Sequence, residues 1–343
     1  MASIRDIAHS VGCSIATVSR VVNNRDAVDP ETRKRVLAAI KKYDYRPNLT
    51  AQGLRSKRGR LIGIAIPTST VGAFSVIVQY ALDTAYKHDY NLVVVNTHED
   101  PDLEENLIKD LLRRNINGVM LTRVSDESKI VKKIVKQNIP IVMIDRAFEH
   151  ENVSNVVLDN QKAGYLAARH LLELGHEEIA CITGALKITL CRERLKGFQG
   201  ALADAGIGLP KSRIAEGNFL YESGIGCMER LSSAGEPLTA VWAMNDLMAF
   251  GALRVLQRKG RRVPEDVSVL GMDDLEIAEM VTPPLTSVHY PLKELVENAM
   301  ELLIKQINTK ETLTETIVLE PSMTIRSSTA RCAELAHGAP GRH

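Results

Sequence analysis

The first fifty residues place side chains suited to DNA binding at the spacing of a helix-turn-helix. Ala8 is a small residue where two helices could cross, Gly12 can make the turn between them, and Val18 is an apolar residue that could fix the second helix on the first. The residues that the second helix would then present to the major groove are Ile15, Ala16, Thr17, Arg20 and Asn23. Any three-helix bundle also needs a small residue and a glycine, so the spacing leaves a purely structural role open.

The charge of the chain is unevenly distributed. Residues 1–60 hold 13 Lys and Arg against five Asp and Glu, whereas the remaining residues hold 30 against 37. A basic head on a mildly acidic body favours a polyanionic partner for the head. The alternative is a solvated basic face, but together with the helix-turn-helix spacing the charge favours DNA.

Three short helices are expected to form this head. Gly12 can end the first, Ser14 can cap the second, and Asp29 followed by Pro30 can open the third, which must stop before Pro47. The predicted apolar stripes are Ile4, Ile7, Ala8 and Val11 in the first helix, Ala16, Val18, Val21 and Val22 in the second, and Val36, Leu37, Ile40 and Tyr43 in the third.

From Leu61 the pattern changes to short apolar runs separated, for the most part, by 20–30 residues. These runs are LIGIAIP, LVVVNT, GVMLT, IVMID, NVVLD, IACITG, AVWAMN and VSVLGMD. The spacing predicts βα units with buried parallel strands, in either a barrel or two doubly wound sheets. A long helix is expected over 291–308 and an extended strand over 316–328, and the segment 330–343 is expected to be a disordered tail.

Composition excludes several other classes of protein. No apolar run is long enough to span a membrane, and the charged N-terminus is unlike a signal peptide, so a cytoplasmic protein is expected. The five cysteines are scattered and indicate free thiols, not disulfides or a metal site. A sugar-converting enzyme is an alternative, but the chain lacks a phosphate-binding glycine loop, an H-E-x-x-H motif and a G-x-S-x-G motif. A sugar-binding transport protein is another, and the basic head argues against it.

Several stretches together resemble the lactose-repressor/galactose-repressor (LacI/GalR) family of bacterial transcriptional regulators, from about residue 3 to 329. They include IRDIAHSVGCSIATVSRVVNN, VDPETRKRVLAAIKKYDYRPN, AQGLRSKR, RERLKGF, AMNDLMAFGALRVL and VPEDVSVLGMDDLEIAEMVTPPLTSV. The resemblance implies an N-terminal all-α helix-turn-helix domain followed by an α/β core like that of periplasmic binding proteins, with two doubly wound parallel-sheet subdomains around a ligand cleft.

This resemblance also implies domain boundaries. The DNA-binding domain would span 1–46, and the effector-binding core would span 60–329. Within the core, the N-subdomain would comprise about 60–158 and 292–320, and the C-subdomain about 159–291 and 321–329. The linker 47–59 would form a hinge helix that orders on operator DNA and enters the minor groove. The linker residues that match the family's DNA contacts are Ala51, Leu54 and Arg55.

The family's cleft residues can be carried onto this chain. The matching positions are Phe74, Asp145, Arg146, Arg194, Phe219, Asn245, Asp273 and Tyr290. Carboxylates and amides suit paired sugar hydroxyls, arginine donates a fork of hydrogen bonds, and an aromatic ring can stack on a sugar face. Each residue could instead serve the fold, as a helix cap, a local ion pair or a core ring.

Two features depart from the family's sugar-binding members and leave the effector open. The loop after the first predicted strand lacks the Asn-Pro-Phe-Phe run that is common in the sugar-binding members and keeps only Phe74 of it. Tyr290 stands where those members often carry glutamine. A pentose, a hexose, a sugar phosphate or a purine therefore stays possible, with a pentose such as ribose preferred. The resemblance implies a repressor that has no cofactor and binds a palindromic operator as a homodimer. A dimer is expected instead of a tetramer because the C-terminal segment has no leucine heptad of the kind that forms tetramers in some family members. Whether the effector is an inducer or a co-repressor stays open.

Overall fold

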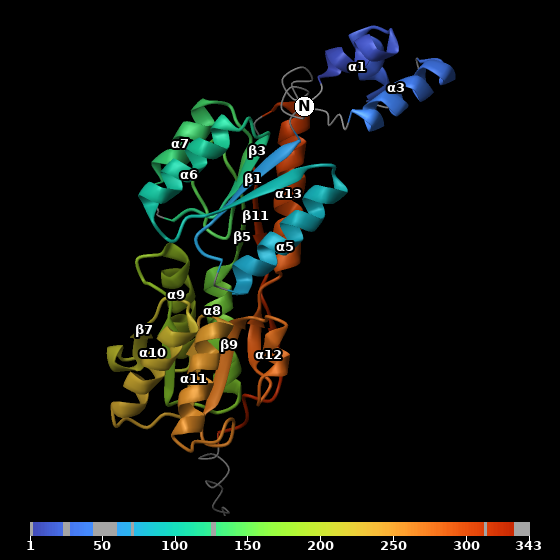
Figure 1. Ribbon diagram of the computed structural model, residues 1–343. Helices are drawn as coiled ribbons and strands as arrows, with labels where there is room; N and C mark the ends of the chain where they lie inside the picture. The colour runs from blue at the N-terminus through green and yellow to red at the C-terminus, as the bar shows by residue number, and fades with distance from the viewer. Residues whose placement is uncertain are drawn as a thin grey trace, which may run out of the picture. The chain divides into compact units, whose positions relative to one another are not determined.

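The chain folds into two units, Met1–Gly59 and Arg60–His343, each with a hydrophobic core of its own (Figure 1). The computed structural model describes residues 3–22, 28–43, 60–69, 72–124, 128–311 and 314–332. Among the helices of these segments, none has the length and apolar character needed to cross a membrane.

Three helices form the described part of the first unit: α1 (Ile4–Val11), α2 (Ile15–Val22) and α3 (Pro30–Lys42). Ser3 and Asp6 cap α1 reciprocally, and Gly12 ends it in the left-handed conformation with φ 66°. Asp29 caps α3, with Pro30 in the first turn. These termini agree with the caps and breakers expected from the sequence.

The core of the first unit contains most, but not all, of the predicted stripes. Its buried residues are Ile7, Ala8, Val11, Val18, Val21, Val36 and Ala39. The prediction was wrong for Ala16, which is exposed, and for Leu37 and Tyr43, which are 51% and 41% exposed. Each residue turns a helix by about 100°, so Val36 and Ala39 share the inner face of α3 while Leu37 points away from it.

The second unit contains two six-stranded sheets. Of the two architectures that the strand spacing allowed, the chain therefore forms doubly wound sheets and not a barrel. The first sheet has the order β11-β5-β4-β3-β1-β2, and all its described pairs are parallel. Its strands are β1 (Leu61–Ile66), β2 (Asn91–Asn96), β3 (Gly118–Leu121), β4 (Ile141–Ile144), β5 (Ser154–Leu158) and β11 (Thr316–Leu319).

The second sheet has the order β12-β10-β9-β8-β6-β7, in which only the edge pair β10–β12 is antiparallel among the described pairs. Its strands are β6 (Ile179–Thr183), β7 (Ile214–Glu216), β8 (Ala240–Ala243), β9 (Ser268–Asp273), β10 (Thr286–His289) and β12 (Ser322–Thr324). The sequence analysis missed β7 and β10, whose short sequences IAE and TSVH mix polar and apolar residues and form no apolar run.

Helices cover both faces of each sheet. Along β1, Ile62 and Ile64 pack into the core formed with α5 and α13, whereas Ala65 packs into the core formed with α6 and α7. Figure 1 shows these two pairs of helices on opposite sides of the first sheet. The helices of the first sheet are α5 (Gly72–Lys87), α6 (Pro101–Arg113), α7 (Lys129–Lys136) and α13 (Leu292–Thr309). Those of the second are α8 (Asn160–Glu173), α9 (Thr189–Asp204), α10 (Tyr221–Ser233), α11 (Asp246–Arg258) and α12 (Ile277–Met280), with a 3₁₀ turn η1 (Lys211–Arg213).

The chain passes between the two sheets after β5, after β10 and after β11. The single extended strand expected over 316–328 is wrong: Pro321 separates β11 in one sheet from β12 in the other, because proline cannot donate to a strand ladder. We refer to the parts of the second unit built on the first and second sheets as the N-subdomain and C-subdomain.

The prediction of a disordered tail over 330–343 was wrong for its first three residues. The Cys332 amide donates to the Leu174 carbonyl, and the Ala330 amide donates to Ser268 Oγ. Cys332 is buried. These contacts fix residues 330–332 on the C-subdomain, and residues 333–343 lie outside the described residues.

A close helix crossing positions one wall of the candidate site. A Cβ atom added at Gly164 on α8 would lie 1.9 Å from the Arg194 carbonyl oxygen, and one added at Gly197 on α9 would lie 1.8 Å from the Gln161 carbonyl oxygen. Because neither glycine has a side chain, the two backbones touch. This contact sets the position of α9 and therefore of Arg194.

Candidate functional site

One cavity, of about 40 Å³, gathers every residue that the sequence analysis assigned to the ligand cleft. Its described lining comprises those eight residues, Phe74, Asp145, Arg146, Arg194, Phe219, Asn245, Asp273 and Tyr290, together with Ala73, Ile77 and Leu190. Such a volume holds only a few water molecules. In this arrangement the two subdomains are closed tightly around the cleft, and a sugar-sized molecule enters only if they separate.

The cleft residues come from the carboxyl ends of strands, as expected for ligand sites in doubly wound sheets. Asp145 follows β4, Asp273 ends β9 and Tyr290 follows β10. Parallel strands end at the same edge of a sheet, so side chains that are far apart in the sequence meet there. Asn245 follows β8, Phe219 lies between β7 and α10, Phe74 lies in the first turn of α5, and Arg194 lies on α9.

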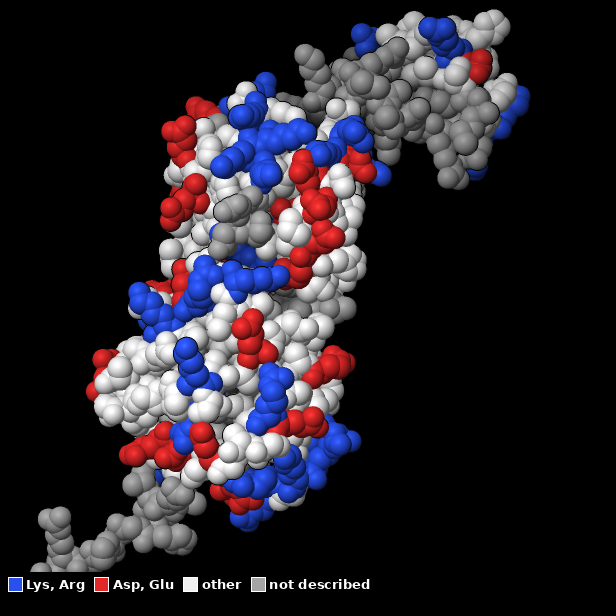
Figure 2. Space-filling view, turned by 90° about the vertical axis from the view of Figure 1, so that its left-hand side faces the viewer, with Lys and Arg blue, Asp and Glu red and all other residues white. Residues whose placement is uncertain are grey.

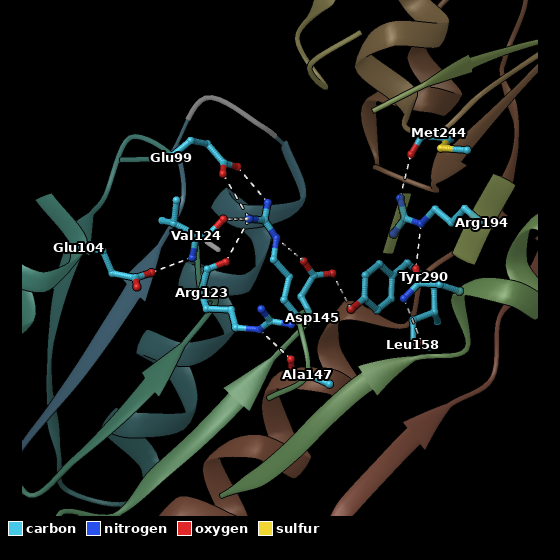
Figure 3. Close-up of polar contacts among 12 residues, drawn as sticks. Glu99, Glu104, Arg123, Val124, Asp145, Ala147, Leu158, Arg194, Met244 and Tyr290 are labelled. Atoms are coloured by element: carbon cyan, nitrogen blue, oxygen red, sulfur yellow. Dashed lines mark hydrogen bonds and ion pairs between the residues drawn. The ribbon is translucent and has the colours of Figure 1, made fainter. Parts of the chain in front are cut away.

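Asp145 takes part in a hydrogen bond that joins the two subdomains (Figure 3). The Tyr290 hydroxyl donates to Asp145 Oδ1 over 3.1 Å. Both side chains are buried. Burial raises the pKa of Asp145, and the guanidinium groups of Arg146 and Arg194 oppose that rise. Burial and the neighbouring Asp145 carboxylate raise the pKa of Tyr290, so its hydroxyl keeps its proton and acts as a donor.

Arg146 lies behind Asp145 and is directed mainly into the N-subdomain. Its two terminal nitrogens pair with the Glu99 carboxylate at 2.9 and 3.2 Å, and Nη1 also donates to the Arg123 carbonyl. Burial disfavours the charge of Arg146, but the Glu99 carboxylate outweighs this effect and raises its pKa. Its Nε atom is buried without a hydrogen-bond acceptor among the described residues and lies 4.0 Å from Asp145 Oδ2.

Arg194 is held by two hydrogen bonds. Nε donates to Asn160 Oδ1 over 2.8 Å, and Nη1 donates to the Met244 carbonyl over 2.9 Å. Within the described part of the chain Nη2 has no acceptor, so this nitrogen is the one available to a ligand. Asn160 was not identified from the sequence, although an asparagine directly after a strand and an aspartate is a recognisable helix start.

Asp273 provides a second carboxyl group in the cleft wall. Burial and the neighbouring Asp246 carboxylate raise its pKa. Among the described residues none donates a hydrogen bond to the Asp273 side chain, although the residue is only 4% exposed. A buried carboxyl group without a donor is costly, and a ligand that donates hydrogen bonds would relieve that cost.

Phe219 and Asn245 form a connected part of the wall. The ring of Phe219 lies where a side chain at Gly184 would be, since an added Cβ there would come within 2.2 Å of it. Asn245 is already engaged: Oδ1 caps α11 by accepting from the Met248 amide, and Nδ2 donates to the Phe219 carbonyl. In this arrangement Asn245 positions the Phe219 ring, and the side-chain amide of Asn245 is bonded to the protein and not directed to a ligand. The sequence analysis did not identify Gly184, for which the Thr-Gly pair ending β6 was the available signal.

The expected DNA-reading residues differ in how α2 presents them. Ala16 and Arg20 are exposed, whereas Ile15 packs partly against the core and the Thr17 hydroxyl shares a hydrogen bond with Ser14 Oγ. Asn23, Ala51, Leu54 and Arg55, together with the hinge 47–59, lie outside the described residues. Figure 2 shows basic and acidic side chains interspersed on one face of the Arg60–His343 unit, and the sequence places the basic excess in residues 1–60.

Comparison with known proteins decides the family. Residues 3–48 match the model of the bacterial regulatory proteins of the lacI family, and residues 168–329 match the periplasmic binding protein-like domain. The HTH-type transcriptional repressor PurR of Mannheimia succiniciproducens is 35% identical over 97% of this chain and 100% of its own. The chain belongs to the LacI family.

Solved structures of this family agree with the fold. A lac repressor dimer bound to operator and the anti-inducer ONPF has a TM-score of 0.86 and 29% identity, covering 96% of this chain and 99% of its own. The transcriptional regulator CelR in complex with cellobiose has a TM-score of 0.73 and 31% identity, covering 96% and 100%. The chain is therefore a LacI-family DNA-binding transcriptional repressor, not an enzyme, with a periplasmic-binding-protein-like core.

Proposed function

We propose that this LacI-family repressor responds to a neutral monosaccharide bound in the cleft. The observation that supports this most directly is the pair of buried carboxyl groups, Asp145 and Asp273, facing one cavity with a single available guanidinium nitrogen on Arg194. Sugar hydroxyls donate to carboxylates and accept from guanidinium groups. The rings of Phe74 and Phe219 supply the apolar surface that a sugar face needs.

The charge of the cleft argues against a phosphorylated effector. Glu99 pairs with both terminal nitrogens of Arg146, so Arg194 is the cleft arginine with a terminal nitrogen left for a ligand among the described residues. Burial already raises the pKa of both Asp145 and Asp273, and a phosphate beside them would add an uncompensated negative charge. A pentose such as ribose is preferred, because a small sugar requires the least separation of the two closed subdomains. The repressor would control a sugar-utilisation operon.

A purine is the second candidate, because the PurR of Mannheimia succiniciproducens is 35% identical over nearly the whole chain. Three rings line the cavity, those of Phe74, Phe219 and Tyr290, and aromatic rings can stack on a base. A purine also donates and accepts hydrogen bonds at its edge. The two candidates differ in the number of hydroxyl donors that they offer to the two carboxyl groups.

Thermal melting of the full chain with D-ribose, D-xylose, D-glucose, ribose 5-phosphate or hypoxanthine separates these candidates. A neutral sugar is expected to raise the melting temperature, because it binds only the folded protein, and ribose 5-phosphate is expected to have no effect. Asp273→Asn should weaken sugar binding about tenfold or more. The matched variant Asp266→Asn, at a half-buried carboxylate that pairs with Arg262 and does not line the cavity, should not. A rise with hypoxanthine alone would establish the purine and reject the sugar.

The repressor is further proposed to bind a palindromic operator as a homodimer, at the bacterial nucleoid in the cytoplasm. Exposed apolar side chains support self-association. They lie on α5 and β2, where Tyr86 is 84% exposed beside Leu82 and Val94, and on α12, where Met280 is 69% exposed beside Ile277.

Two variants test this surface by sedimentation. Tyr86→Glu should shift the protein from dimer to monomer and reduce operator affinity, because two recognition helices bind more tightly than one. Val318→Glu is the control, since Val318 is 53% exposed on β11, at the opposite edge of the sheet from β2. A Tyr86→Glu protein that stays dimeric places the interface elsewhere.

A further inference from the structure

The Asp145 carboxylate has a donor near each of its oxygens, and only one of these donors joins the subdomains. Tyr290, after β10 of the C-subdomain, donates to Oδ1 over 3.1 Å. Arg146 Nε, in the N-subdomain, is a buried donor 4.0 Å from Oδ2 and has no acceptor among the described residues. A distance of 4.0 Å is too long for a hydrogen bond, so the carboxylate is engaged by Tyr290 and not by Arg146 Nε.

Arg146 cannot move to close this gap. Glu99 holds both of its terminal nitrogens, and the Arg123 carbonyl holds Nη1 a second time. The carboxylate of Asp145 is the group that can turn. A rotation that brings Oδ2 toward Nε would satisfy the orphan donor and would leave Oδ1 as the one oxygen for which the Tyr290 hydroxyl and a ligand hydroxyl compete.

The Tyr290 hydroxyl also fits the place that the proposed function assigns to a sugar. It is a neutral hydroxyl on an apolar ring, it donates to Asp145, and it lines the same cavity. Tyr290 is only 3% exposed, so its ring occupies space within the closed cleft. A ligand hydroxyl of the same chemistry reaches Asp145 Oδ1 most directly by displacing the phenol.

We infer that Tyr290 is an internal competitor for Asp145, and that its hydroxyl sets the affinity of the cleft and its requirement for a hydroxyl donor. The inference rests on the proposed ligand site but not on the identity of the ligand. When a ligand displaces the phenol, Asp145 turns toward Arg146 Nε and keeps one oxygen for the ligand. Tyr290 is therefore a specificity-determining residue, although in this closed arrangement its hydroxyl bonds to the protein.

Tyr290→Phe tests the competition, because it keeps the ring and removes only the hydroxyl. The full chain is titrated by calorimetry with D-ribose, D-xylose, D-glucose and hypoxanthine. The variant is expected to bind about tenfold or more tightly than the wild type, since hydrogen bonds to charged groups have effects of that size. Tyr165→Phe is the matched control: Tyr165 donates to Asp204 Oδ2 over 3.0 Å, at the surface of α8. It should leave the affinity unchanged.

The outcomes separate this inference from the proposed function. Weaker or unchanged binding in Tyr290→Phe overturns the competition, even if D-ribose binds the wild type and so supports the sugar. Tighter binding of hypoxanthine alone supports the competition and rejects the sugar. If none of the four compounds binds either protein, no competitor is being removed and the inference fails.

A double variant gives a readout without any ligand. If the bond between Tyr290 and Asp145 is present in solution, Tyr290→Phe and Asp145→Asn should lower the melting temperature non-additively, with the double variant losing less than the two single shifts together. Strictly additive shifts would show that the bond does not form, and would overturn the inference independently of the titrations.

Discussion

The crossing of α8 and α9 makes Gly197→Ala a test of how Arg194 is positioned. A Cβ atom at Gly197 would lie 1.8 Å from the Gln161 carbonyl oxygen and 3.0 Å from the Tyr165 amide nitrogen. An ordinary contact needs more than 3.4 Å, so the two helices must separate by more than an ångström. Alanine gains about 1 kcal/mol over glycine in helix propensity, and overpacking against backbone typically costs 1–3 kcal/mol, occasionally more. With a contact this short, we expect Gly197→Ala to lose about 2 kcal/mol or more of the free energy of unfolding.

Gly200 is the matched control on the same helix. A Cβ atom there meets nothing within 4 Å, so Gly200→Ala should keep the propensity gain and stabilise the protein by about 0.5–1 kcal/mol. The assay is urea unfolding followed by the single tryptophan. Trp242 stacks on Phe198 of α9, with ring centroids 4.8 Å apart, and therefore reports on this helix. Equal midpoints for the two variants would refute the close crossing.

Gly197→Ala should also weaken ligand binding in the folded protein. Arg194 lies three residues earlier, on the same side of α9, and its Nε reaches Asn160 on α8 over 2.8 Å. Separating the helices stretches that bond and moves Nη2 within the cleft. Titration below the melting temperature with the sugar that stabilises the wild type measures the loss. An unchanged affinity would mean that Arg194 is positioned by its bond to the Met244 carbonyl alone.

Three further perturbations test the rest of the molecule. If the effector is an inducer, the Arg194→Ala variant should bind operator at wild-type affinity without effector, and added sugar should not release it in an operator titration. Release at the sugar concentration that releases the wild type would show that Arg194 does not belong to the ligand site. Arg20→Ala should cost about 1–3 kcal/mol of operator affinity if the exposed side chain on α2 contacts a base. The operator affinity of the wild type should fall steeply with salt, and a flat salt response would contradict the assignment of the first unit to DNA binding. Burial opposes ionisation of Asp274, but hydrogen bonds from His289, Thr324 and Arg326 outweigh it and lower its pKa to about 2. This carboxylate should therefore contribute about 2 kcal/mol at pH 7, lost as pH falls from about 4 to 2. The Asp274→Asn variant should lack that part of the acid dependence of urea unfolding, and a curve parallel to the wild type contradicts the assignment.

The sequence predicted the elements better than the faces they bury. Caps and breakers are local, so Gly12, Asp29 and Pro30 marked the ends of helices correctly. Leu37 was misplaced because an apolar residue next to Val36 was included in the stripe, although adjacent residues diverge by about 100° around the helix. The strands β7 (IAE) and β10 (TSVH) were missed because they are short and mix polar with apolar residues, whereas the four-residue strands β3, β4 and β8 are continuously apolar.

The eight residues that the family resemblance predicted for the cleft all line one cavity, and their binding of a ligand stays a prediction. What it did not provide were the hydrogen bonds of each side chain. Arg146 is held by Glu99 from the start of α6, and Asn245 makes its hydrogen bonds to Phe219 and Met248. These partners come from other elements, and residue identity alone does not indicate them. The proposed sugar binding therefore depends mainly on Asp145, Arg194 and Asp273, whose side chains keep groups available to a ligand.

Backbone geometry gives an independent reason to place function at this cleft. Asp145, Phe219 and Asp273 adopt φ values of 64°, 69° and 108°, in the region that glycine occupies without strain. A glycine at any of these positions would relieve the backbone, yet each keeps a side chain that lines the cavity. At Phe219 the surrounding fold adapts as well, because Gly184 leaves room for the ring. Strain of this kind persists only where the surrounding structure imposes it, and it concentrates at functional sites. Three strained, non-glycine residues around one cavity therefore favour ligand binding over a purely structural role for these side chains.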